Sequence, residues 1–236
     1  MASRQEPERR DPPVGWVRLR YTKLGPARFM SARDVARLLE RALKRAGVPV
    51  AYSSGFSPHM RVSYAFPAPT GAASQSEYVL VGLASSMEPE EFQQRLGPQL
   101  PDGVRVWASP TTDRHLPPQL AASRWRVTWP GAADAQGVPD AVASFLQAGA
   151  VPVERRAKSG TSTQDVRSAV VLLTSEPAED GMSLTMVLRQ GEPLIRPTDV
   201  TAGLSGWLPQ LPAWGPGLLL REAQGALHDG AVIDLP

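Results

Sequence analysis

The sequence predicts an α+β protein built from two tandem ferredoxin-like (βαββαβ) domains. Three observations lead to this prediction. Residues 16–24, "WVRLRYTKL", alternate apolar and polar side chains, as a half-buried strand does. Residues 32–46 repeat apolar side chains at helical spacing. The patterns across residues 16–110 then follow the order β-α-β-β-α-β, and a similar order returns after residue 123.

The first strand and helix have clear boundaries. "GPARFM" turns the chain after the strand, and Ser31 is a good N-cap with Asp34 three residues later. Gly47 is a fitting C-terminal stop for a helix that fills residues 32–46. The remaining elements of this domain are expected as an extended segment at 61–66, a strand at 76–84, a helix at 87–100 and a closing strand at 103–110.

The second domain repeats this order of elements without visible sequence identity to the first. We expect strands or extended segments at 124–130, 151–160, 165–176, 182–190 and 217–227, and helices at 137–150 and 197–208. The domain boundaries expected are a disordered tail at 1–14, a basic domain at 15–112, a linker at 113–122 and a second domain at 123–236.

Composition excludes several classes of site. The chain of 236 residues has no cysteine, which excludes disulfides, thiolate zinc sites, cysteine nucleophiles and cysteine-ligated iron–sulfur clusters. Its three histidines lie far apart in sequence, so no metal site and no cofactor is expected. No apolar run approaches the length of a membrane span, and the first residues lack the apolar core of a secretory signal. We expect a cytoplasmic protein that does not bind a membrane.

Charge is unevenly distributed along the chain. Residues 1–71 carry 13 Lys and Arg against 5 Asp and Glu, a net charge of +8, whereas residues 72–236 carry a net charge of −6. On the first helix, Arg33, Arg37, Arg41 and Lys44 or Arg45 follow one another at spacings of three and four, which stacks them on one face. This pattern indicates an anionic partner; the alternative is an ordinary solvated surface.

The segment "AYSSGFSPHMRVSYAFPAP", residues 51–69, is a candidate binding loop. Tyr52, Phe56 and Tyr64 can stack on unpaired bases while Arg61 holds phosphates, and Gly55 lets the backbone approach a ligand. Alternatively, Phe56 and Tyr64 belong to the core and Gly55 only makes a turn.

His59 is the one candidate for catalysis. An imidazole can act as general base toward a ribose hydroxyl, and tandem ferredoxin-like domains also occur in endoribonucleases that process CRISPR repeats. That is an analogy of fold, and no second acid, base or nucleophile is visible near His59 in the sequence. The alternatives are a structural histidine in a turn or one that contacts a base.

A second candidate anion site lies at residues 157–167, "AKSGTSTQDVR". Lys158 and Arg167 flank a run of Gly, Ser and Thr that offers hydrogen-bond donors, although the spacing is not that of a P-loop. The alternative is a hairpin tip with solvated polar residues.

The run from residue 19 to residue 83 resembles a radical-SAM-linked family of unknown function, DUF2344. Ser57 departs from the Asn that is common in that family, and a weaker echo covers residues 153–170. The positions that carry the resemblance are Lys23, Gly25, Arg28, Phe29, Ser31, Asp34, the string "YSSGFSPH", Gly71, Ser74 and Glu77.

The resemblance implies a partner rather than a reaction. Members of the family occur fused to, or encoded next to, B12-binding-type radical SAM proteins, and in actinobacteria often beside a ribonuclease E/G gene. This chain has no cysteine for such a cluster, so it resembles a stand-alone, actinobacterial-like accessory member.

The sequence therefore predicts a non-catalytic accessory protein that binds RNA and works with a radical SAM protein in RNA metabolism or modification. The alternatives are a protein-interaction module without nucleic acid and a metal-independent endoribonuclease that uses His59. The expected nucleic-acid or partner-binding residues are Lys23, Arg28, Arg33, Arg37, Arg41, Lys44, Tyr52, Ser53, Ser54, Gly55, Phe56, His59, Arg61, Lys158 and Arg167.

Overall fold

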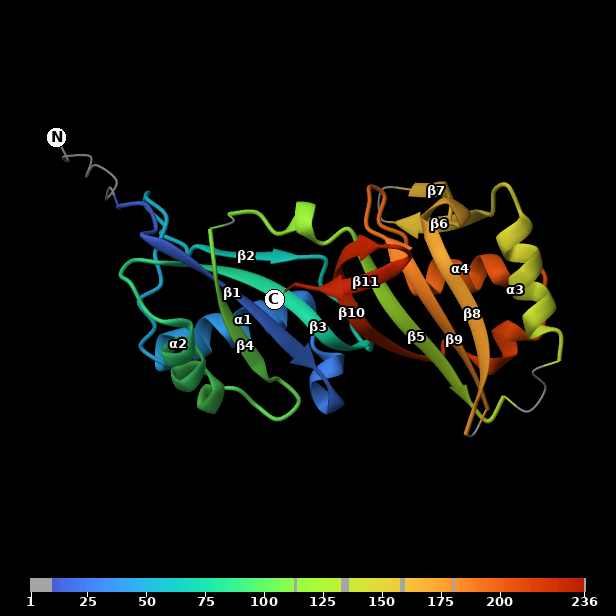
Figure 1. Ribbon diagram of the computed structural model, residues 1–236, viewed down its shortest axis with the longest axis horizontal. Helices are drawn as coiled ribbons and strands as arrows, with labels where there is room; N and C mark the ends of the chain where they lie inside the picture. Colours follow the sequence, from blue (N-terminus) through green and yellow to red (C-terminus); the bar gives the residue numbers. More distant parts are fainter. Residues whose placement is uncertain (1–9, 113, 133–135, 158–159, 180, 236) are drawn as a thin grey trace. The chain divides into compact units, whose positions relative to one another are not determined.

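The first unit of the structure is an antiparallel sheet covered by two helices. The structure is a computed structural model, and it describes residues 10–112, 114–132, 136–157, 160–179 and 181–235 (Figure 1). Contacts divide the chain into a first unit that ends at Pro118 and a second unit from Gln119 to Leu235.

Four strands of the first unit pair in the order β4-β1-β3-β2, each antiparallel to its neighbour. Helix α1 connects β1 to β2, and α2 connects β3 to β4 (Figure 1). The βαββαβ order expected for this part of the chain is therefore present. The strands are β1 (Gly15–Lys23), β2 (Val62–Ala65), β3 (Ala73–Leu83) and β4 (Val106–Thr111), and the helices are α1 (Ala32–Arg45) and α2 (Pro89–Leu96), with short 3-10 turns η1 (Gly25–Phe29), η2 (Gly97–Gln99) and η3 (Pro117–Gln119).

The core of the first unit lies between the sheet and the two helices. Every second residue of β1 points into this core, as its alternating sequence predicts, and both helices add their apolar faces. The buried side chains include Val17, Leu19 and Tyr21 of β1, Val79, Val81 and Leu83 of β3, Val35, Leu39, Ala42 and Leu43 of α1, and Phe92 and Leu96 of α2.

A capping box begins α1. The backbone N–H of Asp34 donates to Oγ of Ser31 at 3.2 Å, and the backbone N–H of Ser31 donates to Oδ2 of Asp34 at 3.3 Å. Hydrogen bonds from the Ser31 side chain and backbone hold the pKa of the Asp34 carboxyl below its ordinary value, with a smaller contribution from Arg37 and Arg33. The N-cap predicted at Ser31 is confirmed, so the start of α1 is fixed locally.

The second unit has the same order of four strands. They pair in the order β10-β5-β9-β8, again antiparallel, and helices α3 and α4 connect β5 to β8 and β9 to β10 (Figure 1). The elements are β5 (Ala122–Pro130), α3 (Val138–Gln147), β8 (Val170–Ala178), β9 (Gly181–Arg189), α4 (Pro197–Leu204), β10 (Leu218–His228) and β11 (Ala231–Asp234), with 3-10 turns η4 (Arg167–Ala169) and η5 (Leu211–Trp214).

A hairpin between α3 and β8 distinguishes the second unit from the first. Strands β6 (Pro152–Ala157) and β7 (Gly160–Asp165) pair with each other in a separate two-stranded sheet. The sequence predicts extended chain in this region and gives a hairpin with solvated polar residues as one of two interpretations of residues 157–167, and β7 is polar and almost wholly exposed. The structure thus supports an α+β fold with an insertion in its second half.

We expect Ser31→Ala to lower the free energy of unfolding by about 1 kcal/mol, because the first turn of α1 loses its side-chain acceptor. Urea denaturation followed by circular dichroism measures the change. Ser57→Ala is the matched control, because Ser57 is exposed and makes no hydrogen bond in the described part of the chain. Equal stability of Ser31→Ala and Ser57→Ala would contradict the role given to the cap.

Candidate nucleic-acid interface

Lys23 is a buried residue that fixes the segment between β2 and β3. Its side chain is 2% exposed, and Nζ donates to the backbone carbonyl oxygens of Ala68 at 3.3 Å and Pro69 at 3.0 Å. Glu77 on β3 is 1% exposed, and its Oε2 accepts the backbone N–H of Ala68 at 3.1 Å. An ammonium and a carboxylate thus bind the same short segment. Lys23 is therefore not available to a ligand at the surface, in contrast to its expected role.

Arg28 holds the other end of this segment. Its Nε donates to the carbonyl oxygen of Gly71 at 2.9 Å, and the N–H of Gly71 donates to the carbonyl oxygen of Arg28 at 2.8 Å. Gly71 has a φ of +91°, which favours glycine. The guanidinium also lies 5.0 Å from the centre of the exposed Phe29 ring. Arg28 is half-buried, and its hydrogen bonds with Gly71 join this segment to the 3-10 turn η1.

Four exposed cations follow the outer side of α1. Arg33, Arg37, Arg41 and Lys44 lie opposite the residues that the helix buries against the sheet. In the part of the chain that the structure describes, none of the four makes a hydrogen bond or an ion pair. We call these four residues the cationic face.

Arg45 is separate from the cationic face. Its Nη2 donates to the carbonyl oxygen of Gln99 at 2.7 Å and its Nε to Oε1 of the same residue at 3.2 Å. These bonds hold the end of α1 against the 3-10 turn η2. Lys44, rather than Arg45, therefore completes the row of cations.

Residues 52–60 form a closed loop, which we call the tip loop. The N–H of Ser53 donates to the carbonyl oxygen of His59 at 2.8 Å, and the N–H of His59 donates to Oγ of Ser53 at 3.0 Å. Tyr52 and Met60 form an isolated bridge at the base. Gly55, with a φ of +123°, allows the turn at the tip. Ser53 thus closes the loop through its two hydrogen bonds with His59.

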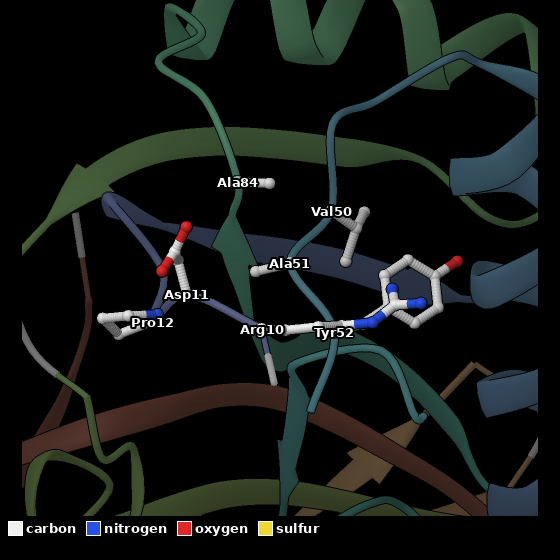
Figure 2. Close-up of a pocket in the computed structure, with 7 residues that line it drawn as sticks. All are labelled: Arg10, Asp11, Pro12, Val50, Ala51, Tyr52 and Ala84. Carbon is white, nitrogen blue, oxygen red and sulfur yellow. The ribbon is translucent and has the colours of Figure 1, made fainter. Parts of the chain in front are cut away.

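Residues 10–14, which we call the N-terminal arm, lie against the tip loop. The N–H of Arg10 donates to Oγ of Ser54 at 3.0 Å, and that hydroxyl donates to the carbonyl oxygen of Arg10 at 3.3 Å. The Arg10 guanidinium lies 5.3 Å from the centre of the Tyr52 ring. Figure 2 shows the Arg10 side chain directed toward this ring. The sequence places these residues in a disordered tail; residues 1–9 of that tail lie outside the described residues.

The three aromatic residues expected to stack on bases have different surroundings. Phe56, at the tip, is 75% exposed, whereas Arg10 covers Tyr52. Tyr64 is half-buried, and its hydroxyl donates to the carbonyl oxygen of Ala36 at 3.5 Å. Burial, with a contribution from Glu40, raises the pKa of the Tyr64 phenol. Phe56 is therefore the aromatic side chain of this region that is open to a ligand.

His59 contributes its backbone to the closure of the tip loop, and its side chain is exposed. Within the described residues the imidazole makes no hydrogen bond or ion pair. General base catalysis works best when a neighbouring group orients the base, and His59 has no such contact here. Arg61, at the end of the loop, is also exposed.

The second predicted anion site is described only in part. Lys158 lies outside the described residues. Arg167 is half-buried and uses its guanidinium internally: Nε and Nη2 donate to the carbonyl oxygen of Leu146 at 3.1 Å and 3.0 Å, and Nη1 donates to that of Val170 at 3.0 Å. It caps the end of α3 and is committed to backbone carbonyls rather than to a ligand.

An ion-pair network that the sequence analysis missed lies across the sheet of the second unit. Nε of Arg124 and Nε of Arg126 contact the two carboxylate oxygens of Glu222 at 2.7 Å and 2.8 Å, and Arg126 also pairs with Glu176. Burial raises the pKa of Glu222, but hydrogen bonds from Arg126 and Arg124 outweigh it and hold that pKa below its ordinary value. Alternation along residues 124–130 could have placed the two arginines on one sheet face, but the bulge that sets Glu222 opposite them has no sequence signal.

The described residues offer neither a metal cluster nor a membrane-spanning helix. No group of three or more His, Asp or Glu side chains there could hold a metal ion, and the sequence has no cysteine. No helix in the described ranges is long and apolar enough to cross a membrane. The cationic face and the tip loop are both exposed at the surface of the first unit.

These observations define an α+β protein of two units, of which the first presents a cationic helix and a closed aromatic loop. A family model described as "Uncharacterized protein conserved in bacteria (DUF2344)" matches residues 16–197, and the chain belongs to this family. No curated protein matches the chain. Among solved structures, one titled as an unknown protein from Galdieria sulphuraria is similar, with 15% identity, coverage of 90% of this chain and 98% of that chain, and a TM-score of 0.25.

We expect Lys23→Met to lower the free energy of unfolding by about 3 kcal/mol, because one buried and one partly buried carbonyl oxygen lose a charged donor. Lys44→Met is the matched control, since it removes an exposed ammonium from the same unit and should change stability by less than about 0.5 kcal/mol. Chemical denaturation of both variants measures the difference. A Lys23→Met protein as stable as Lys44→Met would contradict the structural role of Lys23.

We expect the stabilising effect of Glu222 to depend on pH. Because its folded pKa lies below the ordinary value of 4.5, its contribution is complete above about pH 4.5 and is lost as pH falls through the folded pKa. Urea midpoints of the wild type and Glu222→Gln should therefore differ at pH 7 and converge in acid. Glu192→Gln, which removes an exposed carboxylate without an ion pair in the described residues, is the control. A difference that persists unchanged in acid would rule out this linkage.

Proposed function

We propose that this protein is a non-catalytic RNA-binding accessory protein, and that the cationic face of α1 is its main contact with RNA. The observation that carries the proposal is the row of four exposed cations without an ion pair among the described residues. Arginines of structural importance elsewhere in the chain, such as Arg126 and Arg167, are bound to carboxylates or carbonyls. The four cations on α1 are exposed, so an external anion can reach them.

The spacing of the cationic face suits a phosphate backbone. Residues four apart on a helix are separated by about 6 Å along the axis, so Arg33 to Lys44 span about 16 Å. A regular line of cations can meet successive phosphates, and the counterions released from the nucleic acid then supply much of the affinity. Helix α1 carries two carboxylates, Asp34 and Glu40, against five cations, so its net charge stays positive.

The tip loop favours RNA with unpaired bases over a duplex. Phe56 is exposed at the tip, and Arg61 and His59 are exposed beside it in sequence. Aromatic side chains next to cations are the usual means of holding single-stranded RNA, because every base offers a face to stack on. In this proposal Arg28, Ser53, Ser54 and Gly55 shape the site, Phe56, His59 and Arg61 contact RNA, and Lys158 remains a candidate contact in the second unit.

A radical SAM protein is the partner that we propose, on the basis of the family resemblance. The present chain has no cysteine to ligate the cluster of such an enzyme, so the chemistry would belong to the partner and RNA capture to this chain. We further propose that the two units, at 15–112 and 123–236, are ferredoxin-like domains and that the protein acts in the cytoplasm. The common 4-1-3-2 strand order of the two units supports the first of these points.

We expect Arg37→Gln with Arg41→Gln to weaken binding to single-stranded RNA roughly tenfold at moderate salt, and to reduce the slope of log affinity against log salt by about 1.4. Fluorescence anisotropy at several salt concentrations measures both quantities. Arg105→Gln with Arg114→Gln is the matched control, because it removes two exposed arginines of the same unit away from α1.

An equal loss in both double variants would mean that only net charge matters and that α1 is not the interface. No measurable RNA binding by the wild type would overturn the proposal and leave the same surface as a dock for a protein.

A further inference from the structure

Phe29 is an exposed aromatic side chain that has no role in the function proposed above. It lies in the 3-10 turn η1, three residues before α1 begins, and its ring is 65% exposed. Among the described residues of the first unit, Phe29 and Phe56 are the aromatic side chains with more than half of their surface exposed. Isolated exposed apolar side chains are common on proteins, so the contacts around Phe29 decide whether its ring is a site.

The turn that carries Phe29 is anchored in the first unit. The N–H of Leu24 donates to the carbonyl oxygen of Gly103 at 2.9 Å, and the N–H of Met30 donates to that of Ala27, a buried residue, at 3.0 Å. A Cβ at Gly103 would lie 2.2 Å from the carbonyl oxygen of Leu24, so the two segments are in close contact. The Phe29 ring therefore projects from a fixed turn, which lowers the entropy cost of stacking a ligand on it.

Arg28 lies against one face of the Phe29 ring. Its central guanidinium carbon is 5.0 Å from the ring centre, and its Nε donates to the carbonyl oxygen of Gly71 at 2.9 Å. Within the described residues, Nη1 and Nη2 of Arg28 make no hydrogen bond or ion pair. A guanidinium covers one face of a ring, and the large exposed fraction of Phe29 leaves the other face to solvent. The pair thus offers an aromatic face to a base and N–H groups to a phosphate.

The turn η1 and the tip loop lie at opposite ends of β3. The turn bonds through Arg28 to Gly71, just before β3 begins, whereas the base of the tip loop bonds through Ala51 to Gly82, where β3 ends. Helix α1 leads from one end to the other, and its 14 residues are about 21 Å long. The cationic face therefore lies between the end that carries Phe29 and the end that carries Phe56.

A single strand of RNA can span this distance, but three nucleotides cannot. Successive nucleotides are about 3.4 Å apart in a stacked strand and roughly twice as far apart in an extended one. Three nucleotides therefore cover at most about 14 Å, which is less than the length of α1, whereas nine cover about 27 Å even when they are stacked.

We propose that Phe29, with Arg28 behind it, is a second base-stacking platform, and that one strand of RNA follows the cationic face with one base stacked on Phe29 and another on Phe56. This inference rests on the proposed RNA-binding function. It adds Phe29 to the binding residues expected from the sequence, and it sets a minimum length for the RNA, because a strand shorter than α1 can use one platform only.

The test uses the full chain and three labelled strands of nine nucleotides, which carry the same charge. One is nonaadenosine, one has adenine at its first three positions and abasic sites at the other six, and one is wholly abasic. We expect Phe29→Leu and Phe56→Leu each to bind nonaadenosine roughly tenfold more weakly than the wild type does, because leucine has no aromatic face. Fluorescence anisotropy at constant salt measures the affinities.

The other two strands separate stacking from changes in charge or folding. Neither variant should change the affinity for the abasic strand, which has no base to stack. The strand with three adenines reaches one platform at a time, so the two variants should not both weaken its binding tenfold. Phe29→Trp keeps an aromatic face and is the control that should bind nonaadenosine as the wild type does.

Each outcome bears on one proposal or the other. If the wild type binds nonaadenosine and Phe29→Leu binds it equally well, or loses as much affinity for the abasic strand, the second platform is overturned and the cationic face remains as the RNA contact. A tenfold loss in both variants with the three-adenine strand, or a loss with nonaadenosine in only one variant, overturns the arrangement at two ends of α1. Absence of binding to all three strands overturns the proposed function and this inference together.

Discussion

The buried contact of Lys23 and Glu77 with one peptide segment is the constraint on which much of the first unit depends. Two side chains of opposite charge are removed from water there, and that cost is offset only if hydrogen bonds replace those to water. The carbonyls of Ala68 and Pro69 and the N–H of Ala68 supply these bonds. The segment so fixed receives Arg28 at Gly71, immediately before α1 begins. The direction of the cationic face thus depends on a buried lysine.

The arginines of α1 and those of the sheet in the second unit are compensated differently. In the second unit Arg124 and Arg126 both pair with Glu222, so their charge is partly compensated within the sheet. Among the described residues, no carboxylate forms an ion pair with the four cations of the cationic face. The charge of the sequence is uneven as well, +8 in residues 1–71 and −6 beyond.

Sequence reasoning found what depends on local periodicity and missed what depends on distant partners. Ser31, the apolar stripe of α1 and the exposed row of cations follow from helical spacing. Lys23 was misjudged because lysine is rarely buried, and because the register between β1 and β3 shifts between Tyr21 and Lys23, which no local pattern indicates. Arg167 and the N-terminal arm had no local signal, since their partners, Leu146 and Ser54, are 21 and 44 residues away.

Gly82 shows how one absent methyl group shapes the candidate site. A Cβ at this position would lie 2.9 Å from Cγ of Pro13 and 3.1 Å from Cβ of Arg61. The arm and the strand that leaves the tip loop therefore both occupy a notch in β3 that only glycine provides. Any larger residue would push Pro13 and Arg61 away from β3. The contact between Arg10 and Tyr52 would then be disturbed, although neither of these two residues had changed.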